Sequence, residues 1–116
     1  MKNILVTTTL TLEGYKIKEY KGIISALVVR SPTITQGFFG GVQSLTGGNI
    51  TSFSEMCEQA RTEAYDNIIK RADHIGANAI IGFKYDTSET SGKGFHATEI
   101  FCYGTAVIII KDEILG

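Results

Sequence analysis

The sequence predicts a small α+β domain in which one long amphipathic helix covers a β-sheet, in the order strand, strand, helix, strand, strand. Apolar residues recur at three- and four-residue spacing in a single segment, residues 53–75. Runs rich in β-branched residues lie on both sides of that segment, two before it and two after it. The length of 116 residues fits one domain, which we expect to span residues 1–116.

Two strands are expected before the helix, Ile4–Thr9 and Tyr15–Arg30. The centre of the second strand, residues 23–29, is apolar on both faces, which is typical of a strand that is buried on both sides. The stretch 31–52 follows, and it holds the only proline and several glycines. A loop of this length is unusual in a small domain, so we expect either that it has a role or that part of it is structured.

The helix is expected to begin after Ser52 and to end before Gly76. Ser52 is a favourable N-cap, and Glu55 three residues later completes a capping box. Gly76 stands where a left-handed C-cap residue belongs. The apolar stripe that should lie on the sheet comprises Phe53, Met56, Cys57, Ala60, Ala64, Ile68, Ala72 and Ile75.

Two strands are expected after the helix, Ala79–Asp86 and Thr98–Lys111, joined by a polar hairpin connection over residues 87–97. The last strand is apolar on both faces over residues 105–110. Strand alternation places three large apolar side chains of the preceding strand on one face, namely Ile81, Phe83 and Tyr85.

Two strands are thus apolar on both faces, although a single helix covers only one face of a sheet. A second copy of the chain can cover the other face in a symmetric homo-oligomer. Alternatively, the loop 31–52 can fold back with Phe38 and Phe39. We favour the homo-oligomer, because a small domain gains most from additional burial.

The composition excludes several classes of protein. Eleven Lys and Arg residues against twelve Asp and Glu residues leave no basic excess, so we expect no nucleic-acid partner. No apolar run approaches the roughly 20 residues of a membrane span, and residues 1–8 do not resemble a signal peptide, so we expect no membrane association. Two cysteines cannot build a disulfide framework, and we therefore expect a cytoplasmic protein.

No motif identifies a catalytic residue. Neither cysteine lies in a nucleophile motif. The glycines Gly47 and Gly48 ahead of the helix lack the Lys-Ser/Thr of a phosphate-binding loop, and tight turns or close subunit packing explain them better. An enzymatic role is therefore the least favoured hypothesis.

Soft metal ligands are few and isolated. The candidates are Cys57, Cys102, His74 and His96, and no two of them have the spacing of a zinc site. Each of the two cysteines is better explained as a small buried hydrophobe. A subunit interface can nevertheless assemble a metal site from single ligands.

Arg61 borders the apolar stripe of the helix, and Glu58 lies within one turn of it. An arginine at such a border can hold a carboxylate across an interface or an anionic ligand. The alternative is a solvated side chain that lies along the helix surface. We expect Arg61 and Glu58 to serve an interface or to anchor a loop.

Four short segments carry a recognisable pattern, and the most specific is the block after the helix, Gly76-Ala77-Asn78-Ala79. The others are Ala60-Arg61 in the helix, Tyr20-x-Gly22 in the second strand and Gly47-Gly48 before the helix. Together these segments resemble the YbjQ-like family of small bacterial proteins. The resemblance covers nearly the whole chain.

The resemblance implies a compact α+β domain that assembles with itself into a ring, a homopentamer. It implies no established activity, but the family carries a heavy-metal-binding label. On that label we expect a divalent metal or small ligand at subunit interfaces, with Cys102, His96 and Glu99 of one strand-and-loop region as metal ligands. The alternative is a structural or interaction ring with no small ligand. The residues expected at interfaces or as loop anchors are Arg61, Glu58, Gly47, Gly48 and Asn78.

Overall fold

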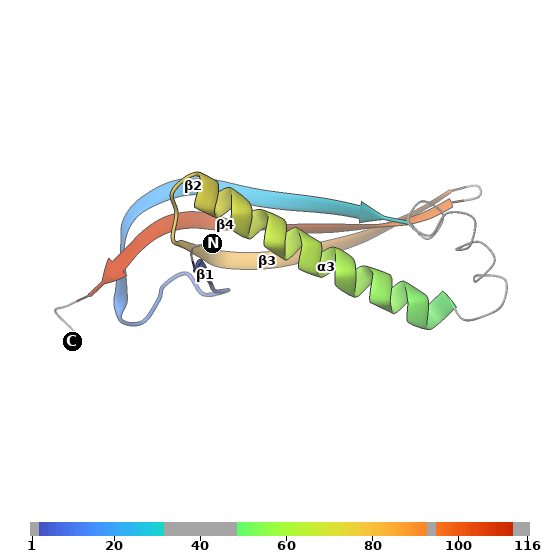
Figure 1. The fold of residues 1–116 in the computed structure, drawn as a ribbon, viewed down its shortest axis with the longest axis horizontal. Helices are drawn as coiled ribbons and strands as arrows, with labels where there is room; N and C mark the ends of the chain where they lie inside the picture. The colour runs from blue at the N-terminus through green and yellow to red at the C-terminus, as the bar shows by residue number, and fades with distance from the viewer. Residues whose placement is uncertain (1–2, 32–48, 93–94, 113–116) are drawn as a thin grey trace. The chain divides into compact units, whose positions relative to one another are not determined.

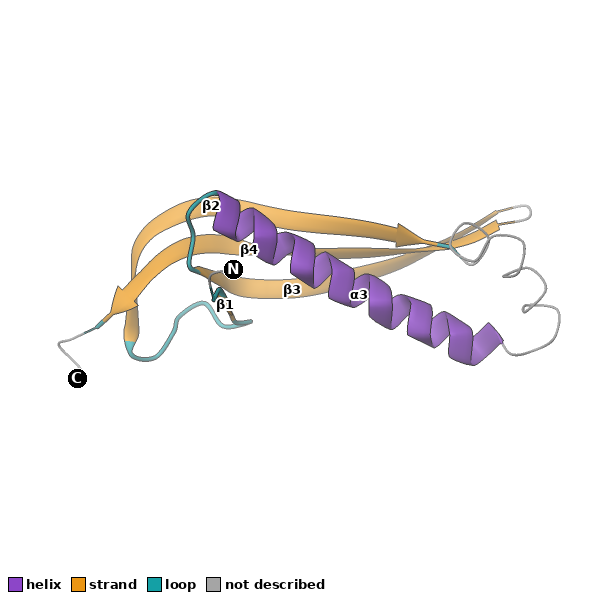
Figure 2. Ribbon diagram, in the orientation of Figure 1, coloured by secondary structure: helices purple, strands orange, loops and turns teal. Residues whose placement is uncertain are grey.

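The chain forms the predicted α+β fold. The elements follow the order β1, β2, α3, β3, β4 among the described residues, which make one helix and a four-stranded mixed sheet (Figures 1 and 2). Phe38 and Phe39, the alternative cover for the second face, lie outside the described residues, as do Gly47 and Gly48. The structure is a computed structural model that describes residues 3–31, 49–92 and 95–112, with side chains for 3–31, 54–89 and 97–112.

Residue contacts divide the chain into two compact units. Unit 1 comprises residues 1–26, 65–85 and 102–116, and unit 2 comprises residues 27–64 and 86–101. The long strands and the helix each contribute residues to both units. The expectation of a single domain over the whole chain stays a prediction.

The strands form a sheet in the order β1-β3-β4-β2. β1 runs parallel to β3, with Leu5 opposite Ala79. The arrows of Figure 2 show that β2 and β3 both run opposite to β4, which lies between them. The bounds of the strands are β1 Leu5–Val6, β2 Tyr15–Arg30, β3 Ala79–Gly92 and β4 Phe95–Lys111.

The bounds of β2 agree with the prediction, whereas those of the other strands differ. β1 is much shorter than Ile4–Thr9, although backbone hydrogen bonds continue beyond it. The N–H of Thr7 donates to the carbonyl of Ile80 at 3.0 Å, and the carbonyls of Thr7 and Thr9 accept from the N–H groups of Phe83 and Gly82 at 3.0 and 2.9 Å. The predicted connection over residues 87–97 is wrong, because β3 and β4 continue into it. Thr and Ser are compatible with strands, and the two strands satisfy each other's backbone groups there, so a polar composition does not by itself mark a loop.

The helix α3 spans Asn49–His74, so it begins three residues before Ser52. The predicted N-cap role of Ser52 and its capping box with Glu55 are therefore wrong. A serine N-cap stabilises a helix start by only about 1 kcal/mol, and a longer helix can outweigh that preference.

The C-terminus of α3 is as predicted. Gly76 adopts a φ of 85°, in the left-handed region. Its N–H donates to the carbonyl of Asp73 at 3.0 Å, and the N–H of Ala77 donates to the carbonyl of Ala72 at 2.9 Å. This pair of bonds is a Schellman motif, which satisfies carbonyls that the end of a helix leaves unpaired.

The apolar stripe of α3 supplies core residues to each unit. Met56, Ala60 and Ala64 are buried in unit 2, and Ile68 and Ala72 are buried in unit 1. The small alanines allow the helix backbone to approach the strands closely. The inclusion of Ile75 in the stripe is wrong: it lies beyond the last helical residue and is 39% exposed.

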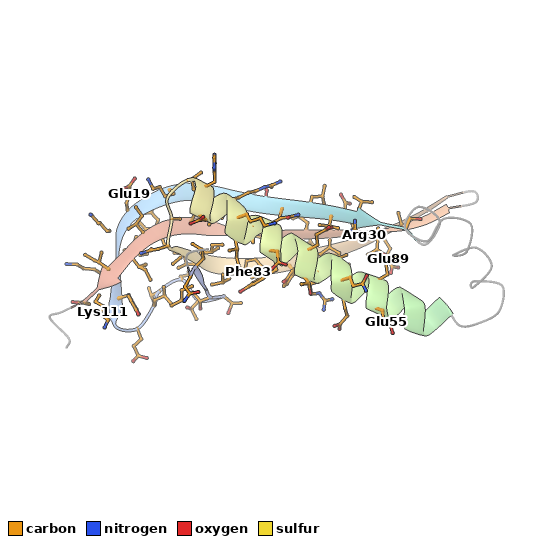
Figure 3. All side chains as sticks on the ribbon, viewed as in Figure 1. Glu19, Arg30, Glu55, Phe83, Glu89 and Lys111 are labelled. Atoms are coloured by element: carbon orange, nitrogen blue, oxygen red, sulfur yellow. The ribbon has the colours of Figure 1, made fainter. Side chains whose placement is uncertain are left out.

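Aromatic and polar contacts tie the C-terminal part of α3 to the strands of unit 1. The rings of Tyr65 and Phe83 meet edge to face with centroids 5.7 Å apart, and Figure 3 labels Phe83 beside the helix. The guanidinium of Arg71 donates to the carbonyl of Ser25 on β2. In Figure 1 this part of α3, coloured yellow, lies along β2 and β4.

A second small core lies in unit 1 and explains the doubly apolar stretch 105–110. It contains Ala79, Ile81, Val107 and Ile109, and the partly buried Leu12 and Ile17 pack against it. The chain thus covers this part of β4 with its own residues 12–17. Neither a second copy nor the loop 31–52, the two covers that the sequence suggested, is needed at this position.

The predicted grouping of Ile81 with Phe83 on one face is wrong. Ile81 belongs to the second small core, whereas Phe83 contacts Tyr65 of the helix. Gly82 lies between them with a φ of 60°, a left-handed conformation that interrupts the alternation of the strand. Its N–H donates to the carbonyl of Thr9 at 2.9 Å.

Candidate metal and interface residues

Cys102 lies on β4 in unit 1 and is fully buried. Burial raises the pKa of its thiol, because the charged thiolate loses its hydration there. A hydrogen bond from the backbone of Ala26 and the positive charge of Arg71 act in the opposite direction and lower this pKa less. Cys102 is therefore a neutral thiol at pH 7, whereas a metal ligand must be a thiolate.

Glu99 lies three residues earlier on β4, in unit 2. The hydroxyl of Ser88 on β3 lies 3.1 Å from its carboxylate and donates a hydrogen bond to it. Side chains alternate along a strand, so Glu99 and Cys102 point to opposite faces of β4. One metal ion held by both residues of the same copy does not fit this alternation.

His96, the third predicted ligand, lies in β4 by its backbone, and its side chain is outside the described part of the structure. Among the side chains that the structure describes, those of residues 3–31, 54–89 and 97–112, no group of three or more His, Cys, Asp or Glu comes close enough together to hold a metal ion. The assignment of Cys102, His96 and Glu99 as metal ligands stays a prediction.

Asn78 follows the Schellman motif and anchors the turn that leads into β3. Its side-chain amide donates to the carbonyl of Ile109 at 3.0 Å, and its side-chain oxygen accepts from the N–H of Ile109 at 2.7 Å. Its backbone N–H donates to the carbonyl of Val107 at 3.0 Å. Asn78 thus anchors a turn within one copy; its predicted part in a subunit interface stays a prediction.

Arg61 and Glu58 are both exposed on α3 in unit 2. Glu58 lines an open depression on the helix surface together with Ser54, Glu55 and Gln59. Both side chains are accessible to a partner, as an interface role requires, and that role stays a prediction. Gly47 and Gly48 lie outside the described residues.

Three polar features of unit 2 could not be expected from the sequence pattern. Arg30 of β2 forms an ion pair with Glu63 of α3 in unit 2. Ser31 and Thr98, also in unit 2, are buried, and their hydroxyls have no hydrogen-bond partner among the described residues. Pairing between residues far apart in the chain depends on strand order, which no spacing reveals.

Exposed apolar side chains are the main feature of the strands in unit 2. Leu27 and Val29 of β2 are each 50% exposed, and Phe101 of β4 is 36% exposed. They alternate with the buried residues Ala26, Val28 and Ile100, so they occupy the face of the sheet opposite to α3. This face is a candidate contact surface.

An open depression of about 440 Å³ is found in unit 1. It is lined by both apolar and polar groups, including Tyr15, Asn78 and Lys111. Asn78 already uses its side chain to hold Ile109.

Within the part of the chain that the structure describes, no helix combines the length and apolarity needed to cross a membrane.

The fold and these residues define a small α+β protein with one long helix on a mixed sheet, with exposed apolar residues on the opposite sheet face. The chain belongs to the YbjQ family, because the model of that family, described as "Putative heavy-metal-binding", matches residues 4–110. Similar chains are UPF0145 proteins. One from Legionella pneumophila is 51% identical over 91% of this chain and 98% of its own length. One from Francisella philomiragia is 45% identical over 91% of this chain and 99% of its own length.

The fold is also similar to that of a solved structure. It is a protein of unknown function of the DUF74 family from Pediococcus pentosaceus. The TM-score is 0.65 with 25% sequence identity, over 92% of this chain and 98% of that one. The similarity extends over nearly the full length of both chains.

Proposed function

We propose that this protein works as a self-assembling homo-oligomer, a ring of five copies, that presents a repeated surface to its partners. The observation that carries this proposal is the exposed apolar face of unit 2, with Leu27 and Val29 half exposed. A monomer leaves the exposed half of each of these side chains in water. Full burial of a side chain of this size is worth about 1.5–3 kcal/mol, so burial of the remaining half stabilises an assembly by about half of that per side chain. A ring of identical copies buries this face once in each subunit.

Metal binding is the second candidate function, and the family description favours it. The exposed face that carries Leu27 and Val29 also holds Glu99, whose carboxylate is partly accessible and hydrogen-bonded to Ser88. In an assembly, carboxylates and imidazoles of adjacent copies meet at subunit contacts. A divalent metal held by Glu99 and His96 of different copies fits this chemistry better than one held by the buried thiol of Cys102.

Native mass spectrometry of the untagged protein, purified without chelator, tests both candidates. We expect a five-fold assembly. A monomer at micromolar concentration would contradict the proposed function. Assemblies of another size would contradict the ring of five but not self-assembly.

The metal candidate is tested by exposing the same assembly to Zn²⁺, Ni²⁺ and Cu²⁺. Metal bound at Glu99 and His96 should be lost in Glu99→Gln and His96→Ala, and retained in the control His74→Ala. Equal metal uptake by all three variants would contradict these ligands.

A further inference from the structure

β2 is an edge strand of the sheet. In the order β1-β3-β4-β2 it has a strand neighbour on one side only, among the described residues. An edge strand presents a row of unpaired backbone N–H and C=O groups. Proteins shield such edges with short strands, proline, charged side chains such as lysine, or covering segments. β2 has 16 residues and no proline, and its charged residues other than Arg30 lie within residues 16–21, so residues 22–29 lack the first three of these protections.

Exposed large hydrophobic side chains are concentrated on β2. Of the eleven large hydrophobic side chains that are exposed among the described residues, five lie on β2. The most exposed is Ile23, at 83%. A long edge strand with exposed apolar side chains is a template for pairing with a strand of another chain. The five residues are Tyr15, Tyr20, Ile23, Leu27 and Val29.

A second open edge belongs to β3. β1 pairs with β3 at Ala79 and Ile80, and the backbone hydrogen bonds beside it reach Phe83, whose N–H donates to the carbonyl of Thr7 at 3.0 Å. Beyond Phe83, residues 84–92 of β3 have no strand on that side within the described chain. In the part of the chain that the structure describes, the sheet therefore has two open edges, one on β2 and one on residues 84–92 of β3.

The two edges carry charges of opposite sign. β2 holds four basic residues and the single acidic residue Glu19, a net charge of +3. Residues 84–92 hold Lys84, Asp86 and Glu89, a net charge of −1. Pairing of β2 with β2 across a twofold axis would bring two basic edges together, whereas pairing of β2 with β3 brings opposite charges together. The basic residues of β2 are Lys16, Lys18, Lys21 and Arg30.

We propose that the free edge of β2 in one copy hydrogen-bonds with residues 84–92 of β3 in the next copy, so that the sheet continues from subunit to subunit. This inference rests on the proposed function and names the contact by which the copies assemble. The contact is heterologous, and heterologous contacts close into rings when the rotation between copies allows it. Because β2 and β3 run in the same direction, copies in the same orientation pair them in parallel (Figure 2).

Oxidative cross-linking tests the proposal. The variant Val29→Cys/Ser88→Cys is prepared in a Cys57→Ser background, so that the buried Cys102 is its only native thiol. Ser88 hydrogen-bonds to Glu99, which shares the exposed sheet face with Val29, so both introduced thiols lie on the same face of the continued sheet. We expect a ladder of covalent multimers on a denaturing gel without reductant, ending at the ring size. The single variant Val29→Cys in the same background should stay monomeric on that gel. Dimers from the single variant, without a ladder from the double variant, would overturn the proposal in favour of a β2–β2 contact.

A charge placed on β2 is the second test. Leu27→Lys should weaken assembly at least tenfold in a dilution series read by native mass spectrometry. The control Leu10→Lys places the same charge on an exposed leucine outside the strands and should assemble normally. Circular dichroism checks that both variants fold.

The outcomes separate this proposal from the proposed function. A monomeric parent chain contradicts the proposed function itself. An oligomeric parent chain that gives no ladder overturns only the assignment of the β2 and β3 edges. A Leu27→Lys variant that assembles as well as the control would in addition contradict burial of the exposed face, the observation behind the proposed function.

Discussion

The side chain of Asn78 pairs with both backbone groups of Ile109, as a strand residue would. Its amide donates to the carbonyl at 3.0 Å and its oxygen accepts from the N–H at 2.7 Å. Asn78 stands directly before the first residue of β3, so the side chain extends the pairing with β4 by one step beyond the strand. Asparagine suits this position because one planar amide supplies both a donor and an acceptor.

Asn78→Ala should therefore destabilise the protein. Both backbone groups of Ile109 lose their partner, and the free energy of unfolding should fall by about 1–3 kcal/mol. Urea denaturation followed by circular dichroism measures the change. Asn78→Asp is the matched variant: it keeps the acceptor but loses the donor, and we expect it to be destabilised as well. An unchanged midpoint in Asn78→Ala would show that water replaces the amide without loss.

Gly104→Ala should be destabilising because β4 has no room for a methyl group at this position. A Cβ there would lie 2.6 Å from Cγ2 of Ile80 and 3.1 Å from the carbonyl oxygen of Ile81. Overpacking of this kind costs about 1–3 kcal/mol. Thermal unfolding of Gly104→Ala measures the effect.

The double variant Gly104→Ala/Ile80→Ala tests whether the clash with Ile80 causes the destabilisation of Gly104→Ala. Removal of the Ile80 side chain makes room for the new methyl group, so the two changes should destabilise less together than the sum of their separate effects. Strict additivity would contradict a clash between the two side chains.

Phe83→Ala should remove the aromatic contacts that hold α3 on β3. Phe83 meets Tyr65 at 5.7 Å and Tyr85 at 5.0 Å, both edge to face. Loss of a buried phenylalanine costs about 3–5 kcal/mol. Tyr85→Ala is the milder comparison, because Tyr85 is exposed. Equal losses in the two variants, measured by urea denaturation, would argue against this role of Phe83.

The thiol of Cys102 should make stability depend on alkaline pH. Burial raises its pKa in the folded protein, so the folded state keeps its proton where the unfolded chain releases it. The free energy of unfolding contributed by this group is fully present below the unfolded thiol pKa of about 8.5 and is lost as pH rises toward the folded pKa. Urea denaturation at pH 7.5 and pH 9.5 should show a larger loss for the parent chain than for Cys102→Ala.

Thiol labelling gives an independent check on Cys102. Cys57 is partly exposed and Cys102 is buried. At neutral pH a thiol reagent should leave Cys102 unmodified in a Cys57→Ala variant and should modify it once urea is added. Rapid labelling without urea would contradict the buried, neutral thiol.

The long elements could be predicted from the sequence because their signals are local. The apolar spacing of α3 and the bounds of β2 follow from side chains that repeat within one segment. Gly76 marked the helix end for the same reason, since its φ of 85° is a property of one residue. The start of α3 was wrong, because the preference of Ser52 for a cap is weaker than the gain from a longer helix.

The candidate site was harder to predict. The sequence put Cys102 and Glu99 in one region, but strand alternation directs their side chains to opposite faces. From the sequence, another copy or the loop 31–52 was expected to cover the second face of residues 105–110. In the structure, Leu12 and Ile17 of the same copy pack against it. These packing relations join residues about 90 positions apart in the chain, and no pattern within one segment specifies them.

The fold class, the family and the burial of Met56, Ala60, Ala64, Ile68 and Ala72 follow from the sequence alone, because periodicity and the Gly-Ala-Asn-Ala block are local features. Three relationships depend instead on tertiary packing: β2 lies at the edge of the described sheet, Gly82 separates Ile81 from Phe83, and Asn78 completes the pairing of Ile109. Strand order and side-chain pairing arise when distant segments pack together, and the free energy of that packing depends on shape and hydrogen bonding across the whole sheet.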